Sequence, residues 1–251
     1  MKKILLFVCL ALLMGFSSCS SDDDNGDLPQ NPSKKLSKIE VYDDNGDLLY
    51  IETFSYDNQD RWIKSELELQ RWYTNDPEYK PEKRIRTLSY TNNSIKYSDD
   101  GYTEIFTLKN NLIVSRHEEG STDIYNYQYS NGYLTKIGED YADFEYTNGN
   151  LTKSKEYRNY TISYTNIPDK LGINIFEPSF NDGSINVYPD NPLYQFGYYG
   201  NRSKNLIESI KSNYSSMDGY SCSYTLDKNG YVTEMEKSRN GGGYETYKFY
   251  Y

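Results

Sequence analysis

The chain has 251 residues, with 27 Lys and Arg against 37 Asp and Glu, so its formal net charge at pH 7 is −10. This acidic balance excludes a nucleic-acid partner, which requires a basic surface, and a mean hydropathy of −0.87 excludes a bundle of membrane-spanning helices. The 29 tyrosines favour strands over helices and supply apolar area for a core.

The amino terminus has the pattern of a secretory signal peptide over residues 1–18. Two lysines precede an apolar run from Ile4 to Phe16, which is too short to span a bilayer. Ser17-Ser18-Cys19 follows, and small residues before a cysteine resemble the lipobox of bacterial lipoproteins, where the signal is cleaved and the cysteine is acylated. We therefore predict a lipid on Cys19. The alternative is an ordinary signal that leaves this cysteine unmodified.

An acidic segment follows the cysteine directly. Ser21, Asp22, Asp23 and Asp24 resemble the surface-export signal of Bacteroidota lipoproteins, although a solvated spacer is the alternative. Residues 19–35 contain two prolines and no apolar run, so we predict a flexible tether. These patterns predict a lipoprotein of the bacterial outer membrane that is displayed at the cell surface and touches the membrane through its lipid.

Residues 36–251 repeat one pattern and are predicted to form a single Tyr-rich β-domain. Two aromatic or aliphatic residues at i and i+2 precede a turn centred on Asn, and then Leu, Ile or Val follows, often with Thr and Lys. Tyr127-Gln-Tyr129-Ser-Asn-Gly-Tyr-Leu-Thr-Lys136 is a clear copy. Asn-Gly between alternating runs is the strongest short hairpin signal, and such short connections require antiparallel neighbours. We predict an all-β meander of hairpins, with about a dozen or more strands, curved into a barrel or half-barrel.

The predicted strands have two different faces, because successive side chains alternate across a strand. One face is dominated by Tyr and the other often carries charge, which favours a sheet in water over a lipid-spanning barrel. The residues predicted to line a ligand-binding concavity are Tyr127, Tyr129, Tyr146, Tyr160, Tyr164 and Tyr224. Phe144, Ile162 and Leu226 are predicted to face inward with them.

One stretch, Gly172 to Gly200, interrupts the hairpins with three prolines and four glycines. Asn191 and Pro192 at its centre, with glycine at residue 200, predict one short helix near 191–200. We expect this insert to plug or cap one mouth of the curved sheet.

The chain resembles an uncharacterised family of Bacteroidota lipoproteins. The lipoprotein signal, the Tyr-rich Asn-Gly hairpins, the Pro-Leu-Tyr helix, Arg202-Ser-Lys-Asn-Leu206 and Tyr224-Thr-Leu-Asp-Lys-Asn-Gly-Tyr-Val232 carry this resemblance. It implies a porin-like fold for nearly the whole mature chain and assigns no functional residues. Val41-Tyr-Asp-Asp-Asn-Gly46 also resembles the tyrosine–aspartate repeats of secreted toxin shells, which we attribute to shared hairpin chemistry.

No catalytic constellation, metal site or cofactor is predicted. The mature chain has one histidine, His117, and no nucleophile motif beside it. Alternation places Cys222 in register with Tyr220 and Tyr224, as a small buried hydrophobe. The segment Asp43-Asp-Asn-Gly-Asp47 has oxygens spaced as in a calcium loop, but its residues are also those of a hairpin turn, which we favour.

Two functions from different classes remain. The first is a non-enzymatic binding or scaffolding protein whose Tyr-lined concavity holds a glycan, a peptide or an amphiphile. The alternative is an envelope hydrolase with a pair of carboxylates in the same concavity; Glu66 and Glu68 share one strand face. The lack of a catalytic constellation favours binding. If the tyrosines only fill a barrel, the protein has a structural role.

Overall fold

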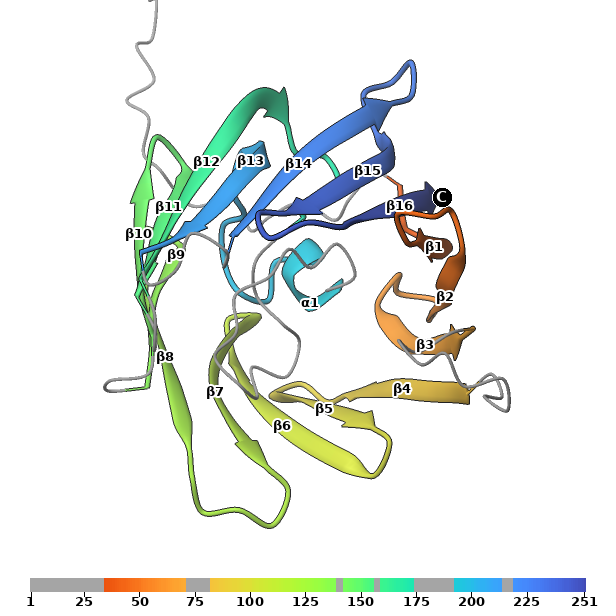
Figure 1. Ribbon diagram of the computed structural model, residues 1–251. Helices are drawn as coiled ribbons and strands as arrows, with labels where there is room; N and C mark the ends of the chain where they lie inside the picture. The colour runs from red at the N-terminus through yellow and green to blue at the C-terminus, as the bar shows by residue number, and fades with distance from the viewer. Residues whose placement is uncertain (1–33, 71–81, 139–141, 156–158, 174–191, 214–218) are drawn as a thin grey trace, which may run out of the picture.

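The strands form a closed antiparallel barrel. The computed structural model describes residues 34–70, 82–138, 142–155, 159–173, 192–213 and 219–251. In this part of the chain, sixteen strands pair in sequence order, and β1 pairs with β16 to close the ring (Figure 1). The strands are β1 Lys38–Tyr42, β2 Leu48–Tyr56, β3 Trp62–Leu69, β4 Glu82–Tyr90, β5 Ser94–Asp99, β6 Tyr102–Lys109, β7 Leu112–Glu118, β8 Tyr125–Ser130, β9 Tyr133–Ile137, β10 Ala142–Thr147, β11 Asn150–Lys155, β12 Asn159–Pro168, β13 Asn205–Ser212, β14 Gly219–Leu226, β15 Val232–Arg239 and β16 Tyr244–Tyr250. The predicted all-β barrel is confirmed in its closed form.

Part of the sequence prediction lies outside the described residues. The signal peptide at 1–18, the lipidation site Cys19, the acidic export segment and nearly all of the tether up to residue 33 belong there, and they stay predictions. No helix in the described part of the chain is long and apolar enough to cross a membrane.

Strand alternation gives the barrel two ends. Because neighbouring strands are antiparallel, every turn after an even-numbered strand lies at one end, which we call the tyrosine end. It contains the turns at 57–61, 91–93, 110–111, 131–132, 148–149 and 227–231, together with Lys34 and Tyr251. The predicted Asn-Gly turns are confirmed: Asn131 and Gly132 have φ of 50° and 77°, as a two-residue hairpin turn requires.

A β-bulge recurs at the tyrosine end and explains the repeated Leu-Thr of the sequence. Gln128 pairs with Lys136 and Tyr129 pairs with Leu134, so Thr135 is an extra residue in β9. Its hydroxyl donates to the carbonyl of Gln128 at 3.1 Å. A bulge of this kind bends and twists a strand, which helps a sheet to curl into a barrel. The register shifts at this end lie at Ser55/Tyr56, Thr107/Leu108, Gln128/Tyr129, Glu145/Tyr146, Ser163/Tyr164 and Thr225/Leu226.

Tyrosine hydroxyls at the ends of six of the eight even-numbered strands, β2, β4, β8, β12, β14 and β16, bond to the chain segment of the strand before each. Tyr129 Oη donates to the carbonyl oxygen of Ile113 at 2.6 Å, and Ile113 stands where β7 has its own bulge. The hydroxyl thus supplies a hydrogen bond to the backbone where the ladder is interrupted. The other bonds of this kind are Tyr56 to Leu36, Tyr90 to Trp62, Tyr164 to Leu151, Tyr224 to Ile207 and Tyr251 to Val232, at 2.6–2.8 Å.

The described part of the insert between β12 and β13, residues 169–173 and 192–204, fills the tyrosine end from within, and residues 174–191 of the predicted insert lie outside the described residues. Its helix α1 (Pro192–Gln195) lies inside the ring of strands (Figure 1), and Leu193, Tyr194 and Tyr199 are at most 3% exposed. The backbone of the insert is tied to the wall by Ile113 N to Tyr198 O (2.9 Å), Asn201 N to Gly132 O (2.7 Å) and Lys204 N to Gly149 O (3.1 Å). The predicted short helix and the predicted plug are both observed.

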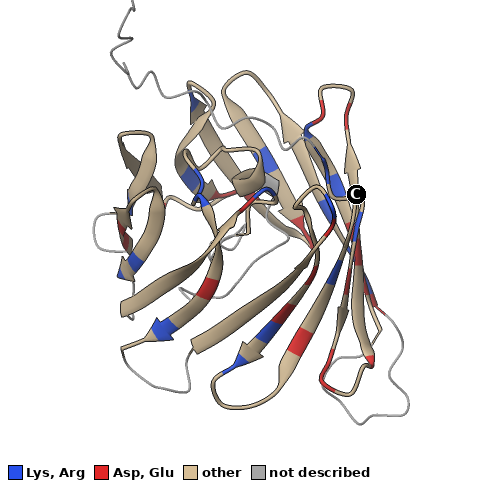
Figure 2. Cartoon of the chain, turned by 90° about the horizontal axis from the view of Figure 1, so that it is seen from above, with Lys and Arg blue, Asp and Glu red and all other residues tan. Residues whose placement is uncertain are grey.

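The outer face of the barrel is polar. Lys64 contacts Glu66 at 2.5 Å and Lys153 contacts Glu145 at 2.7 Å on outward-facing positions, and charged residues occur on strands all around the wall (Figure 2). Charged groups lose much of their hydration energy in an apolar medium. The outward face therefore suits water, as the alternation predicts.

Candidate functional site

A half-open pocket of about 550 Å³ lies at the tyrosine end. Its walls come from the turns after β2, β4 and β6 and from the insert that follows α1. The side chains fall into an aromatic group, an amide and hydroxyl group, one cation and one aliphatic residue. They are Tyr90, Phe196 and Tyr198; Gln59, Asn92, Asn111 and Thr91; Arg61; and Leu108.

The aromatic side chains form one wall of this pocket. The rings of Tyr90 and Tyr198 have centroids 6.1 Å apart and planes inclined by 30°, and Phe196 packs edge-on against Tyr56 at 6.0 Å. The hydroxyl of Tyr90 donates to the carbonyl of Trp62, which holds its ring in place. Burial raises the pKa of Tyr90 and of Tyr198, so both phenols stay neutral near pH 7.

The turn after β2 supplies the polar rim. Asp57 begins this turn, and its Oδ1 accepts hydrogen bonds from the backbone N–H of Gln59 and Arg61, both at 2.9 Å. The guanidinium of Arg61 contacts the Asp57 carboxylate at 2.7 Å and lies 4.6 Å from the centroid of the Tyr90 ring. The charge of Arg61 is therefore balanced beside the pocket, and its guanidinium adds to the aromatic wall.

The six tyrosines predicted to line a concavity face inward, as expected, but they lie in the core. Tyr127 and Tyr160 are 5% and 6% exposed, while Tyr129, Tyr146, Tyr164 and Tyr224 pack against the core and are partly buried. None of the six is among the described lining residues of the pocket. Phe144, Ile162 and Leu226 also face the core, as predicted.

Sequence reasoning missed the pocket because its walls are distant in sequence. Tyr90 occurs in a weak copy of the hairpin repeat, whereas Phe196 and Tyr198 belong to the insert. The sequence feature that could have indicated the pocket is the group of aromatic residues beside Gly197, in the segment that breaks the repeat. No sequence pattern shows which hairpins this segment contacts.

A network of buried charges crosses the inner wall from β2 to β5 and was also missed. Arg86 contacts Glu52 at 3.0 Å and Asp99 at 3.4 Å. Arg84 contacts Asp99 at 2.5 Å, and the hydroxyl of Tyr97 donates to the same carboxylate at 3.1 Å. Glu52 is 0% exposed, so its ion pair is shielded from water and costs desolvation as well as stabilising the wall.

A neighbouring pair, Glu104 and Arg116, is 1% and 3% exposed. Arg116 Nη1 donates to Glu104 Oε1, and the hydroxyl of Tyr102 donates to the same oxygen at 2.8 Å. Burial outweighs these contacts and raises the pKa of Glu104 to about 7. The pair joins β6 to β7 in the interior of the barrel.

The other residues singled out in the sequence lie outside the pocket. Cys222 is half-buried against the core, and burial raises the pKa of its thiol to about 11, so it stays a neutral thiol near pH 7. His117 lies on β7. Asp43 Oδ1 accepts hydrogen bonds from the backbone of the Asp43–Asp47 turn, which is the favoured turn chemistry. Glu66 and Glu68 share one face of β3, as expected, and that face points away from the buried residues of the strand. No metal-binding group of three or more His, Cys, Asp or Glu occurs among the described residues.

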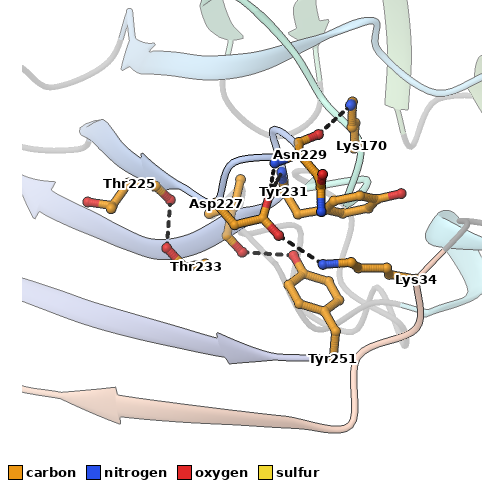
Figure 3. A network of polar contacts seen from close by, with 9 residues as sticks. Lys34, Lys170, Thr225, Asp227, Asn229, Tyr231, Thr233 and Tyr251 are labelled. Atoms are coloured by element: carbon orange, nitrogen blue, oxygen red, sulfur yellow. Dashed lines mark hydrogen bonds and ion pairs between the residues drawn. The ribbon is translucent and has the colours of Figure 1, made fainter.

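Lys34, the first described residue, contacts side chains at the tyrosine end beside the carboxyl-terminal Tyr251 (Figure 3). Lys34 Nζ contacts Asp227 Oδ2 at 2.8 Å and lies 4.5 Å from the ring centroid of Tyr231 and 5.1 Å from that of Tyr251. The ion pair is the first cause of a pKa near 2 for Asp227. The chain therefore enters the barrel at the same end as the pocket.

The fold has counterparts among solved structures. A porin-like protein from Bacteroides uniformis ATCC 8492 is similar with a TM-score of 0.65 and 20% sequence identity, over 87% of this chain and 98% of that chain. A porin-like protein from Bacteroides vulgatus ATCC 8482 is similar with a TM-score of 0.56 and 12% identity, over 86% of this chain and 98% of that chain. No curated protein matches significantly.

The sequence itself supports the same grouping. Residues 54–233 match a family described as a domain of unknown function (DUF4595) with a porin-like fold. The matched segment runs from within β2 to the start of β15 and includes the insert, the pocket walls and the Glu104–Arg116 pair. The chain therefore belongs to this family, and the predicted resemblance to a family with a porin-like fold is confirmed.

Proposed function

We propose that this protein is a lipid-anchored envelope protein of the bacterial outer membrane, displayed at the cell surface, and that it binds a ligand without transforming it. The pocket at the tyrosine end carries the proposal. It has an aromatic wall formed by Tyr90, Phe196 and Tyr198 and a rim of side-chain amides, a combination of apolar area and placed polar groups that is typical of ligand sites.

The proposed site differs from the concavity expected from sequence. Three of the six interior tyrosines, Tyr129, Tyr164 and Tyr224, donate their hydroxyls to backbone carbonyls of the wall. Hydroxyls used in this way hold the barrel together. Tyr198 instead stands in the insert at the pocket, half-buried, and can meet a ligand without loss of a strand-to-strand bond.

Binding is preferred over hydrolysis because the buried carboxylates are engaged. Glu52 and Asp99 contact Arg86, and Glu104 contacts Arg116. A glycosidase needs one acid and one base on either side of the substrate. Glu66 and Glu68, which share one strand face as expected from the sequence, point outward from β3, away from the barrel interior.

The lipid anchor is tested by Cys19→Ala. We expect the variant to leave the membrane fraction, because the amino terminus then lacks the acyl chains that hold a water-compatible barrel to the bilayer. Fractionation followed by immunoblotting measures the distribution. Replacing Asp22, Asp23 and Asp24 with Ala separates anchoring from display: this chain should stay in the membrane fraction but resist protease added to intact cells. Sedimentation of the Cys19→Ala chain with membranes would contradict the anchor.

The pocket is tested by a thermal-shift screen of saccharides, peptides and amphiphiles. A ligand present at one hundred times its Kd stabilises the folded state by about 2.7 kcal/mol, which corresponds to a rise in Tm of about 5–10 °C for a domain of this size. The shift should disappear in Tyr198→Ala and persist in Tyr244→Ala, since Tyr244 is an exposed tyrosine on β16 at the opposite end. Equal shifts in both variants would place binding elsewhere.

A further inference from the structure

We infer that the ligand of this pocket is a neutral saccharide, an inference that rests on the proposed binding function and narrows it to one chemical class. Among the three classes expected from sequence, the charges, the topology and the lining side chains each favour this one.

The charge balance of the pocket disfavours ionic ligands. Arg61 is its one charged side chain among the described lining residues, and Asp57 contacts that guanidinium through both Nε and Nη2 at 2.8 and 2.7 Å. An anion would have to compete with this carboxylate, and a cation would meet the guanidinium. Specific recognition of a charged ligand needs an unmatched opposite charge, so the pair favours a neutral ligand.

The closed barrel disfavours a peptide. Extended peptides commonly bind by adding a strand to a sheet edge, where backbone groups are unpaired. In the described chain β1 pairs with β16, and every strand has a neighbour on both sides. A peptide at this pocket would therefore lack the backbone partners that give this mode its affinity.

The lining side chains disfavour an amphiphile and suit a sugar ring. Leu108 is the one aliphatic side chain among the described lining residues, whereas sites for apolar chains are lined mostly by hydrophobic side chains. A pyranose has a flat face of C–H groups and an edge of hydroxyls. Aromatic rings such as those of Tyr90 and Tyr198 suit packing against C–H groups, and amides on three different turns can both donate to and accept from hydroxyls.

The inference is tested with two matched probes, a linear glucose hexamer and a galacturonate hexamer, on the purified chain by titration calorimetry. The glucose hexamer should bind, and Tyr198→Ala should weaken it at least tenfold, or about 1.4 kcal/mol, while Tyr244→Ala leaves it unchanged. Asn92→Ala, at an exposed turn position, should weaken it by about two- to tenfold through one lost hydrogen bond. Asn92→Ala keeps the test valid if Tyr198→Ala fails to fold.

The other outcomes separate the inference from the proposed function. If a panel of neutral hexamers of glucose, mannose and xylose does not bind, but galacturonate, a peptide or a detergent binds in a Tyr198-dependent way, the saccharide inference is overturned and binding stands. If none of these probes shows binding that depends on Tyr198 or Asn92, both are overturned. Equal affinity for the glucose and galacturonate hexamers would also overturn the claim of neutrality.

Discussion

Replacement of Arg116 by Met is expected to lower the free energy of unfolding by about 3–5 kcal/mol, because removal of one partner leaves an uncompensated carboxylate in a dry wall. Glu104 is 1% exposed and accepts from Arg116 and Tyr102. In a domain of this size the loss corresponds to a fall in Tm on the order of 10 °C. Chemical denaturation followed by circular dichroism measures the free energy of unfolding, and a thermal melt followed by the same signal measures Tm.

The same variant should depend on pH in a defined direction. The pKa of Glu104 is raised from 4.5 to about 7 in the folded protein, so its neutral form stabilises the fold fully below about pH 4.5, and this contribution is lost as the pH rises through 7. Loss of Arg116 removes an attraction that lowers this pKa, and the defect should therefore be larger at pH 8 than at pH 5. The double variant Arg116→Met with Glu104→Gln should recover most of the loss. A defect independent of pH and unaffected by Glu104→Gln would contradict a charge origin.

Truncation of a wall tyrosine is the second large effect. Tyr129→Ala is expected to cost about 3–5 kcal/mol, as other large aromatic truncations in cores do, because its ring packs against the core and its hydroxyl bonds Ile113. Tyr129→Phe isolates the hydroxyl and should cost about 1–3 kcal/mol, since the Ile113 carbonyl loses a donor beside a bulge. Urea denaturation measures both variants.

The control for this series is Tyr244→Phe. Tyr244 is 41% exposed, so its change should stay within about 0.5 kcal/mol. If Tyr129→Phe were equally neutral, the hydroxyl-to-carbonyl bonds would not fasten the wall, and the tyrosine surplus would need another explanation.

Local sequence patterns predicted the hairpins because turn chemistry and side-chain alternation are local. The Asn131-Gly132 turn and the shared face of Tyr127 and Tyr129 depend on residues close in the chain, and both are observed. The choice between a barrel and a half-barrel was left open, since closure depends on pairing between Lys38–Tyr42 and Tyr244–Tyr250, at opposite ends of the sequence. No short-range pattern records that contact.

The interior charges were missed for a different reason. Glu52 lies in β2 between Ile51 and Thr53, and alternation alone puts it on the same face as Phe54; a lone carboxylate on an apolar face gives no sign of its partner. That partner, Arg86, comes from β4, two strands away. The pocket could not be predicted for the same reason, because the closed fold decides which three hairpins the insert contacts.

Closure of the barrel by β1 and β16 restricts how the number of strands can change in chains with this fold. In a ring of antiparallel strands, direction alternates all the way round, so only an even number of strands leaves the seam antiparallel. Loss or gain of a single strand would bring two parallel strands together at the seam, which would need the different hydrogen-bond pattern of a parallel pair. A hairpin with its tyrosine and its β-bulge consists of two strands, so whole hairpins can be duplicated or deleted while the number of strands stays even. The circumference of the barrel then changes in steps of one hairpin.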